Sequence, residues 1–236
     1  RGVNWWKLDE TSGAVARDSW GSNSGTLVGG PTHIEGKVGN ALAFDGTDDY
    51  VSTPDSPLWD FGTGDFAIGF WINPSISSNR RPIINNRGGG GGVAGMWAVE
   101  IYDNANVIEF HSGTLIRLEA TESIPVSTWT HVMVTRNSGT LTVYYNGVSK
   151  GSAIDNTNYD AGSDLYIGDD VMPDATNDLG GNYFRGLIDE VKIYSRALTL
   201  EEIRTDAGIP VTRTLVMAAT GQGATVPALG AHDYVA

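Results

Sequence analysis

The 236-residue chain contains no cysteine, which excludes disulfide bonds and thiolate metal sites. This absence suits an exported bacterial protein but does not prove export. The chain also lacks any run of about eighteen apolar residues, so we expect no membrane insertion. No signal peptide is visible, and because the chain begins at Arg1 we interpret it as a piece of a longer protein.

Positive charge is scarce as well. Lys and Arg number 15 against 28 Asp and Glu, which gives a formal net charge of -13. A field of this sign repels polyanions, so we expect no nucleic-acid partner, although a local basic patch could still defeat that inference. The acidity suits solubility and calcium binding, and we expect a monomer.

Glycine and aromatic residues are abundant, with 31 Gly, 7 Trp and 9 Tyr, and they favour turns and pleated surfaces over long helices. Short strands separated by glycine and asparagine turns are predicted along most of the chain. They cover residues 4–9, 41–44, 66–72, 96–102, 107–111, 115–119, 129–136, 141–146 and 165–168. About a dozen such strands predict an all-β fold, a two-sheet antiparallel sandwich.

The stretch from Gly186 to Ile203, GLIDEVKIYSRALTLEEI, predicts one more strand that ends in a short helical turn. Asp189 shares its parity with the apolar residues Leu187, Val191 and Ile193. Thr199 stands three residues before Glu202, a capping box that starts a helix through about Arg204. A buried carboxylate needs a cation or several donors, so we expect a partner for Asp189 from the first 25 or so residues.

Two stretches are predicted to be long loops. In residues 75–95, Arg80, Arg81 and Arg87 flank a run of five glycines, which loses too much backbone entropy to form a strand or helix readily. Residues 169–182 form the second loop. Its acidic residues are Asp169, Asp170, Asp174 and Asp178.

Several segments also carry a family resemblance. They are WWKLDETSG, ARDSWG, GKVGNALAFDGTDDYV, FAIGFWINP, WTHVMVTR, LTVYYNG and GLIDEVKIYSRALTLEEI. In this order and spacing the chain resembles, from Val3 to Arg204, the laminin-G-like jelly rolls of the concanavalin A-like lectin/glucanase superfamily. The resemblance implies a jelly roll that often serves as a carbohydrate-binding or adhesive module in secreted multidomain bacterial proteins.

In such folds the first and last strands lie side by side, which would bring the loop around Asp18 near Asp189. We therefore predict that Asp18 and Asp189, with carbonyls from residues 22–25, hold one structural Ca²⁺. The alternative is that Asp18 caps a turn and Asp189 accepts backbone N–H groups. The turn with Asp45, Asp48 and Asp49 is a rival site or an ordinary Asp-Gly turn, and the 169–182 loop could chelate a second ion.

Catalytic motifs are missing. Glycosidases of the superfamily carry E-x-D-x-x-E, and no such string occurs here. Glu100, Glu109, Glu119 and Glu122 are interpreted as solvent-facing strand residues, and the four histidines show no metal or triad spacing. We therefore predict that the chain is not an enzyme.

A sugar site should combine aromatic rings with planar polar groups. Trp97 and Tyr102 lie near the arginines, whose guanidinium groups match carboxylate or sulfate oxygens. We hypothesise that an acidic polysaccharide binds there, although the arginines could instead serve solubility or pair with Asp. The predicted ligand-binding residues are Arg80, Arg81, Arg87, Trp97, Tyr102, Asp170, Asp174 and Tyr183.

Two segments are predicted, a jelly roll over residues 1–206 and a linker with the truncated start of a following β-repeat over 207–236. The tail cannot build a core alone. We predict a non-catalytic carbohydrate-binding module of a larger secreted bacterial protein, with a polysaccharide and neighbouring domains of the same chain as partners. The alternative is a protein–protein adhesion or spacer module at a cell surface, because one fold serves many functions.

Overall fold

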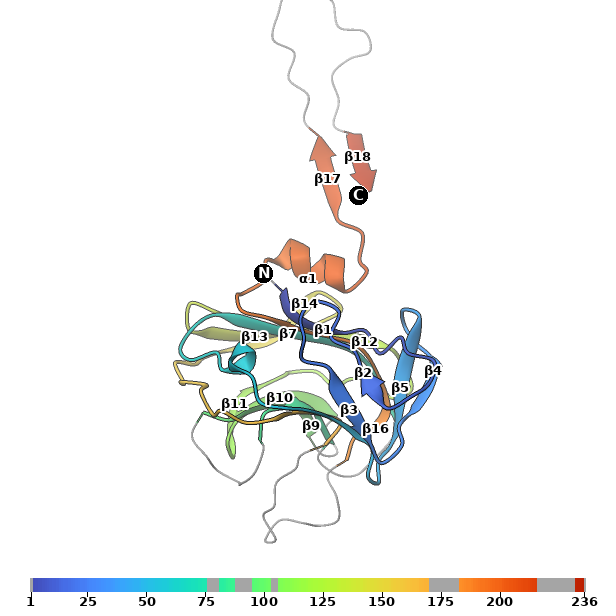
Figure 1. The fold of residues 1–236 in the computed structure, drawn as a ribbon. Coiled ribbons are helices and arrows are strands. Elements are labelled where there is room, and N and C mark those ends of the chain that lie inside the picture. The colour runs from blue at the N-terminus through green and yellow to red at the C-terminus, as the bar shows by residue number, and fades with distance from the viewer. Residues whose placement is uncertain are drawn as a thin grey trace, which may run out of the picture.

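Two antiparallel sheets stacked face to face form the body of the protein in the computed structural model (Figure 1). The structure describes residues 2–75, 81–87, 95–102, 106–169, 183–215 and 232–235. The predicted all-β sandwich with one short helix near its end is confirmed.

The first sheet contains the two ends of the sandwich sequence. Its order is β14 (Val148–Ile154), β13 (Thr140–Tyr145), β12 (Thr130–Asn137), β7 (Phe66–Pro74), β16 (Arg185–Tyr194), β5 (Asn40–Asp45) and β4 (Thr32–Glu35). β1 (Gly2–Trp6) also pairs with β16, with Trp6 opposite Val191. The first and last strands of the sandwich therefore lie side by side, as the family resemblance implies.

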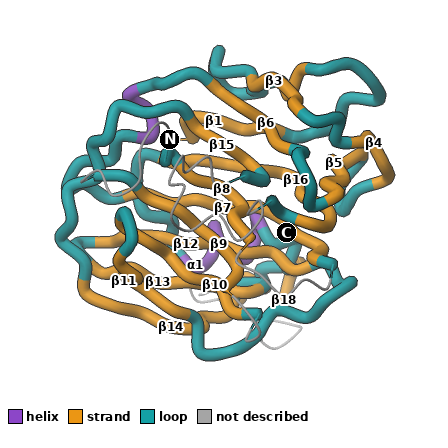
Figure 2. The backbone as a smooth tube through the Cα atoms, turned by 90° about the horizontal axis from the view of Figure 1, so that it is seen from below, coloured by secondary structure: helices purple, strands orange, loops and turns teal. Residues whose placement is uncertain are grey.

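The second sheet lies below the first in Figure 1 and faces the viewer in Figure 2. Its order is β11 (Leu115–Glu119), β10 (Val107–Ser112), β9 (Trp97–Tyr102), β8 (Arg81–Asn85), β15 (Leu165–Ile167), β6 (Tyr50–Thr53), β3 (Gly25–Val28) and β2 (Val15–Ala16). The expectation of a loop throughout 75–95 is wrong at β8, a central strand. Pro82 stands at a register shift in that strand, a position where a missing N–H is tolerated.

The core lies between the sheets and is rich in aromatic rings. Phe66 stacks on Phe61 with ring centroids 4.3 Å apart, and the fully buried Trp97 stacks on Phe110. Arg136 places its guanidinium 5.0 Å from the rings of Phe66 and Tyr159. Alternation along each strand sends one set of side chains into this core and the other set outward.

A bulge in β16 interrupts the strict alternation of side chains that the sequence predicted for this strand. The register shifts between Asp189 and Lys192, and Glu190 has a φ of 56°, a left-handed conformation uncommon for a residue with a side chain. Ile188 enters the core before the bulge, and Val191 enters it afterwards. Strict alternation from Leu187 to Ile193 was therefore the wrong expectation.

Helix α1 (Leu200–Asp206) packs on the outer face of the first sheet (Figure 1). Its predicted capping box is present, since Thr199 accepts from the Glu202 amide and Glu202 accepts from the Thr199 amide. Ile203 packs into a small cluster with Met133 and Leu198. A 3-10 turn, η1 (Pro57–Trp59), precedes β7, and no helix among the described residues is long and apolar enough to span a bilayer.

The tail contributes one more strand pair. β17 (Thr212–Leu215) pairs with β18 (His232–Val235) and with no other described strand. The two strands stand beyond α1, away from the second sheet (Figure 1). The boundary at residue 206 stays a prediction.

Candidate ligand-binding face of the second sheet

The outer face of the second sheet carries a row of mostly polar residues in register. Val51, Ile167, Val99 and Phe110 point into the core, so their neighbours of opposite parity point outward. From one edge toward the other, the row is Thr26, Ser52, Tyr166, Asn85, Ala98 and His111. This row joins residues that are far apart in sequence.

Two half-buried tyrosines lie together on this face. The rings of Tyr50 and Tyr166 have centroids 6.1 Å apart and planes inclined at 55°. Burial, with the nearby Asp164 carboxylate, raises the pKa of Tyr166, so its hydroxyl stays protonated at neutral pH. The pair offers apolar ring faces next to hydroxyl donors.

A buried polar cluster lies farther along the same face. The His111 Nε2 atom is 2.6 Å from a Glu109 carboxylate oxygen and 2.7 Å from a Glu100 oxygen. All three side chains are at least nine-tenths buried. Burial alone would lower the pKa of His111, but the two carboxylates outweigh it and raise the pKa above its usual value.

Arg87 supports this cluster from the side. Its Nη1 atom lies 3.3 Å from the second oxygen of Glu100, and its Nη2 atom donates to the Gly113 carbonyl at 2.8 Å. The guanidinium is fully buried. Arg87 therefore pairs with protein groups in the interior and does not present its fork to solvent.

The interpretation of Glu100 and Glu109 as solvent-facing strand residues is wrong. Both are buried, and Glu109 is paired in register with Glu100 across β10 and β9. The available signal was the spacing of Glu109 and His111, two residues apart on one strand, which places both on the same face. Finding Glu100 beside them requires the strand register, which the sequence does not state.

The structure brings together only part of the predicted sugar site. Asn85 connects the two segments that supply most of the predicted ligand residues. Its Oδ1 atom accepts from the Arg87 amide at 3.0 Å, and its side-chain amide donates to the Asp169 carbonyl at 2.5 Å. Asp169 in turn forms a β-bridge with Tyr183. Arg87 and Tyr183 thus lie at the same end of the second sheet.

The other predicted ligand residues lie elsewhere. Arg81 is buried at the opposite end of β8, where it donates to the Ser75 carbonyl, and Tyr102 is exposed on β9 near that end. Trp97 is in the core and donates to the Trp59 carbonyl at 3.0 Å. A surface role for Arg81, Arg87 and Trp97 does not fit these positions, while Arg80, Asp170 and Asp174 fall outside the described residues.

The residues at Asp18 do not fit the predicted calcium ion. One oxygen accepts the amides of Trp5, Trp20 and Gly21, and the other accepts the Asn4 side-chain amide and the Asn23 amide, at 2.7–3.2 Å. Burial pulls the pKa of Asp18 upward, but these hydrogen bonds outweigh it and lower the pKa. Five N–H donors already occupy the carboxylate oxygens, which leaves Asp18 little capacity to coordinate a cation. Asp18 therefore fits the alternative raised from the sequence, a turn cap.

Asp189 receives different donors. One of its oxygens accepts the amides of Lys37 and Val38, each at 2.9 Å, and the other is buried without a hydrogen-bond donor. Burial raises the pKa of Asp189 to about 7. Its partners thus come from the turn before β5 instead of the first 25 residues, and a single open oxygen does not supply the six to eight ligands that Ca²⁺ takes.

The acidic turn between β5 and β6 forms its own hydrogen bonds. Asp49 accepts the Asp45 amide at 2.9 Å, and Asp45 accepts the Thr47 amide at 2.7 Å. One carboxylate oxygen from each of Asp45, Asp48 and Asp49 lies within 4.8 Å of the others. Burial and the two neighbouring carboxylates raise the pKa of Asp49.

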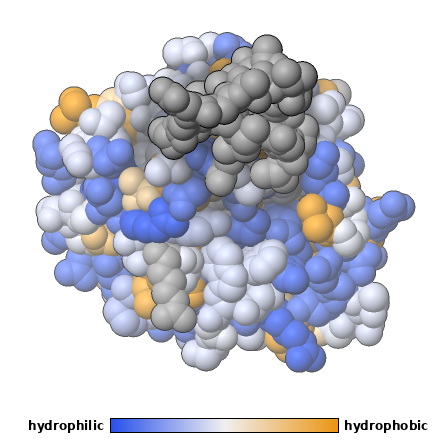
Figure 3. All heavy atoms as spheres, turned by 90° about the horizontal axis from the view of Figure 1, so that it is seen from above, coloured by the Kyte–Doolittle hydropathy of each residue, from blue (hydrophilic) through white to orange (hydrophobic). Residues whose placement is uncertain are grey.

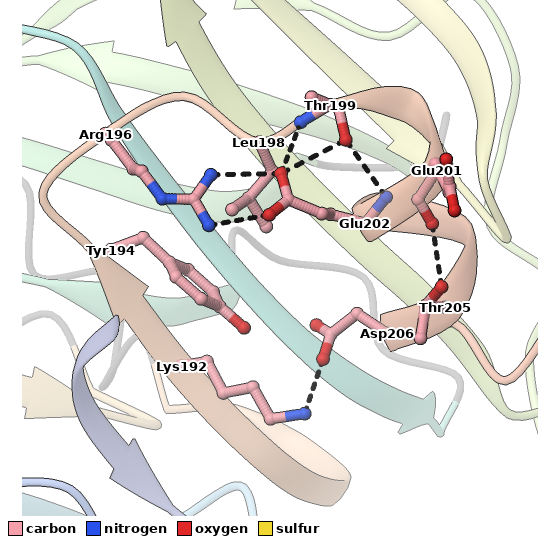
Figure 4. Close-up of a pocket in the computed structure, with 9 residues that line it drawn as sticks. All are labelled: Lys192, Tyr194, Arg196, Leu198, Thr199, Glu201, Glu202, Thr205 and Asp206. Carbon is pink, nitrogen blue, oxygen red and sulfur yellow. Dashed lines mark hydrogen bonds and ion pairs between the residues drawn. The ribbon is translucent and has the colours of Figure 1, made fainter. Parts of the chain in front are cut away.

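A hollow of about 610 Å³ lies on the opposite side of the molecule, between α1 and the end of β16 (Figure 4). Charged groups that line it form two ion pairs: Arg196 with Glu202 at 2.7 Å, and Lys192 with Asp206 at 2.6 Å. The surrounding surface is largely hydrophilic, with small separate hydrophobic patches (Figure 3). Trp20, 41% exposed, lies against Tyr194 at the edge of this hollow.

Similar folds occur in solved structures of carbohydrate-active and carbohydrate-binding proteins. Domain 4 of AbnA, an extracellular arabinanase from Geobacillus stearothermophilus, solved with arabinotriose, has a TM-score of 0.69 at 21% identity, covering 88% of this chain and 98% of that one. A Trypanosoma rangeli sialidase matches at 0.65 and 20% identity over 87% of this chain and 32% of its own. The binding domain of botulinum neurotoxin DC, solved with SialylT, matches at 0.64 and 13%, over 88% and 51%.

The chain thus spans nearly all of the arabinanase domain but about a third of the sialidase and half of the toxin chain. At these identities the likeness shows the fold alone. No curated protein matches the sequence. A sequence profile does match residues 45–204, more than half of the chain, and by that match the chain belongs to the concanavalin A-like lectin/glucanases superfamily.

Proposed function

We propose that the chain is a non-catalytic carbohydrate-binding module of a larger secreted protein and that it binds a polysaccharide on the outer face of the second sheet. The observation that carries the proposal is that the structural match covers nearly the whole arabinanase domain, which was solved as a separate domain with arabinotriose. Nearly the whole of that domain corresponds to this sandwich. A module of this kind holds a parent protein on its substrate.

The chemistry of the face supports sugar contact. Tyr50 and Tyr166 offer inclined rings on which the C–H faces of a sugar can stack, and Thr26 and Ser52 add hydroxyl groups in the same region of the sheet. The tyrosines are half-buried and therefore partly open to a ligand. A shallow site of this kind binds in the micromolar-to-millimolar range, about 4–8 kcal/mol.

The charge of the glycan is not fixed by the arginines. Arg81 and Arg87, two of the three residues that suggested an acidic polysaccharide, are buried and hydrogen-bonded within the protein. We therefore assign binding to ring stacking and hydroxyl contacts, which suit neutral sugars. Binding of an anionic glycan is therefore measured separately from binding of neutral sugars in the test below.

A binding role without catalysis agrees with the state of the Glu100–Glu109 pair of carboxylates on this face. Hydrolysis needs one carboxyl group as an acid and a second as a base or nucleophile, both facing the substrate. Glu100 and Glu109 are instead buried and joined through His111. Neither offers an acid to a bound chain.

The test compares Tyr166→Ala with Trp20→Ala, which removes a partly exposed aromatic side chain from the opposite side of the molecule. Arabinotriose, longer arabino-oligosaccharides and an anionic polygalacturonate are titrated against each folded variant by calorimetry. Tyr166→Ala should weaken binding of the neutral sugars about tenfold, which corresponds to about 1.4 kcal/mol. Trp20→Ala should leave binding unchanged.

Each contrary result has a definite meaning. Loss of binding in Trp20→Ala alone would move the site to the hollow beside α1. Binding of polygalacturonate but not of neutral sugars would contradict the ring-stacking site. No binding of any glycan by the wild-type chain would favour the adhesion or spacer role.

A further inference from the structure

The buried cluster of Glu100, Glu109 and His111 is not used by the proposed sugar site. Its ligand atoms come from two neighbouring strands: Glu109 and His111 lie two residues apart on β10, and Glu100 is opposite Glu109 on β9. One carboxylate oxygen from each glutamate and a ring nitrogen of His111 all lie within 4.8 Å of one another. Strands in the middle of a sheet hold such a geometry rigidly.

We propose that these three side chains form a binding site for a divalent transition metal such as Zn²⁺. Imidazole nitrogen together with carboxylate oxygen is a donor set that suits zinc, and three protein ligands with one remaining position make a common zinc arrangement. An imidazole ligand argues against calcium, which takes oxygen. Nothing in the proposed sugar binding requires this ion.

Hydrogen bonding in the cluster explains why a metal suits it. Each ring nitrogen of histidine carries at most one hydrogen. The Nε2 atom of His111 nevertheless faces two carboxylate oxygens, at 2.6 and 2.7 Å, so one hydrogen must serve both acceptors. A metal ion between the three atoms contacts all of them at once.

The geometry needs only a small adjustment. Zinc lies about 2.0–2.2 Å from nitrogen and oxygen ligands, which places neighbouring ligand atoms of a tetrahedral site roughly 3.3–3.6 Å apart. The two Nε2 contacts, now 2.6 and 2.7 Å, would therefore lengthen by about 0.6–1 Å, which side-chain rotation can supply. Arg87 already holds the second oxygen of Glu100 at 3.3 Å and would fix the orientation of that carboxylate as an outer partner.

The experiment titrates ZnCl₂ into the metal-stripped full chain at pH 7.5 by calorimetry and measures bound zinc after dialysis. Wild-type protein should retain one zinc per chain. Glu109→Gln, close in size to the native residue, and His111→Gln should each weaken binding by more than about 100-fold, beyond the loss common for an outer partner. Asp48→Asn, in the exposed Asp45–Asp48–Asp49 turn, is the control and should bind like wild type.

Circular dichroism and urea unfolding of the metal-free variants establish that they fold. If His111→Gln does not fold, Glu109→Gln decides alone. X-ray absorption of the zinc-loaded chain should show one imidazole and oxygen ligands at about 2.0–2.2 Å. The proposal is overturned if the wild type retains no zinc, if folded Glu109→Gln retains as much zinc as wild type, or if Asp48→Asn abolishes uptake.

Discussion

Two histidines on opposite outer faces of the sandwich have similar neighbours and different arrangements. His131 on β12 contacts Asp206 of α1 at 3.2 Å, and Lys192 lies 2.6 Å from the same aspartate and 3.1 Å from Glu190. His111 on β10 instead contacts two glutamates through one ring nitrogen. We call the first group the α1 clasp and the second the β9–β10 cluster.

The difference lies in how positive groups are distributed. In the α1 clasp the Lys192 ammonium, with three donors, lies between two carboxylates, and the clasp joins the helix to the sheet. Burial lowers the pKa of Lys192, but Asp206 and Glu190 outweigh it and raise the pKa, so the ammonium stays charged. In the β9–β10 cluster the Arg87 guanidinium lies beside one oxygen of Glu100, while the other Glu100 oxygen and a Glu109 oxygen converge on one ring nitrogen. The first arrangement is complete as a structural element, whereas the second suits an added cation.

The largest expected effect comes from breaking the clasp. Lys192→Met keeps the length of the side chain but removes its charge, leaving the buried Glu190 and the largely covered Asp206 without the ammonium. Removing one partner of a buried ion pair is strongly destabilising, and we expect a loss of about 3 kcal/mol in the free energy of unfolding by urea. Glu109→Gln, the matched change in the metal-free β9–β10 cluster, should cost less than about 1 kcal/mol because it relieves a carboxylate–carboxylate contact.

Equal losses in the two variants would contradict this distinction between the clusters. The ranking of the two losses is therefore the measured quantity.

Asp189 sharpens the comparison, because it is a buried carboxylate whose donors are backbone amides alone. Its pKa of about 7 lies above the ordinary value near 4, so the folded state binds a proton that the unfolded state has released. Its stabilising contribution is therefore full below about pH 4 and falls as the pH rises toward 7, by at most about 1.4 kcal/mol per pH unit. Asp189→Asn should remove this slope.

Urea unfolding of both proteins at intervals from pH 4.5 to 8 measures the effect. The variant should gain on the wild type as the pH rises, since an amide cannot ionise. Parallel stability curves across this range would show that Asp189 does not titrate there.

Much of the fold was predictable because its signals are local. The capping box of Thr199 and Glu202 depends on residues three apart, and the hairpin of the strands predicted over 129–136 and 141–146 depends on the short turn between them. Both appear where the sequence predicted them. The pairing of β1 with β16 followed from the family resemblance and not from the residues alone.

The site was less predictable because its signals depend on register. Glu100 meets His111 only through the alignment of β9 with β10, and the bulge at Glu190 changes which residues of β16 face the core. The strand β8 was missed because Arg81 and Pro82 resemble loop residues, although Ile83 and Ile84 are fully buried. Three nearby arginines suggested an exposed basic patch, yet Arg81 and Arg87 have their partners in the interior.

The smallest effect is expected where the same kind of ion pair lies in solvent. Arg196 and Glu202 form a contact of 2.7 Å at the rim of the α1 hollow, but both side chains are about two-fifths exposed. Arg196→Met should therefore lower the free energy of unfolding by about 0.5 kcal/mol, the usual range for an exposed pair, because Glu202 keeps its capping contact with Thr199. The loss should also shrink in 0.5 M salt, whereas the loss in Lys192→Met should persist because a buried pair is screened much less. A loss in Arg196→Met as large as that in Lys192→Met would mean that burial does not set the strength of these pairs.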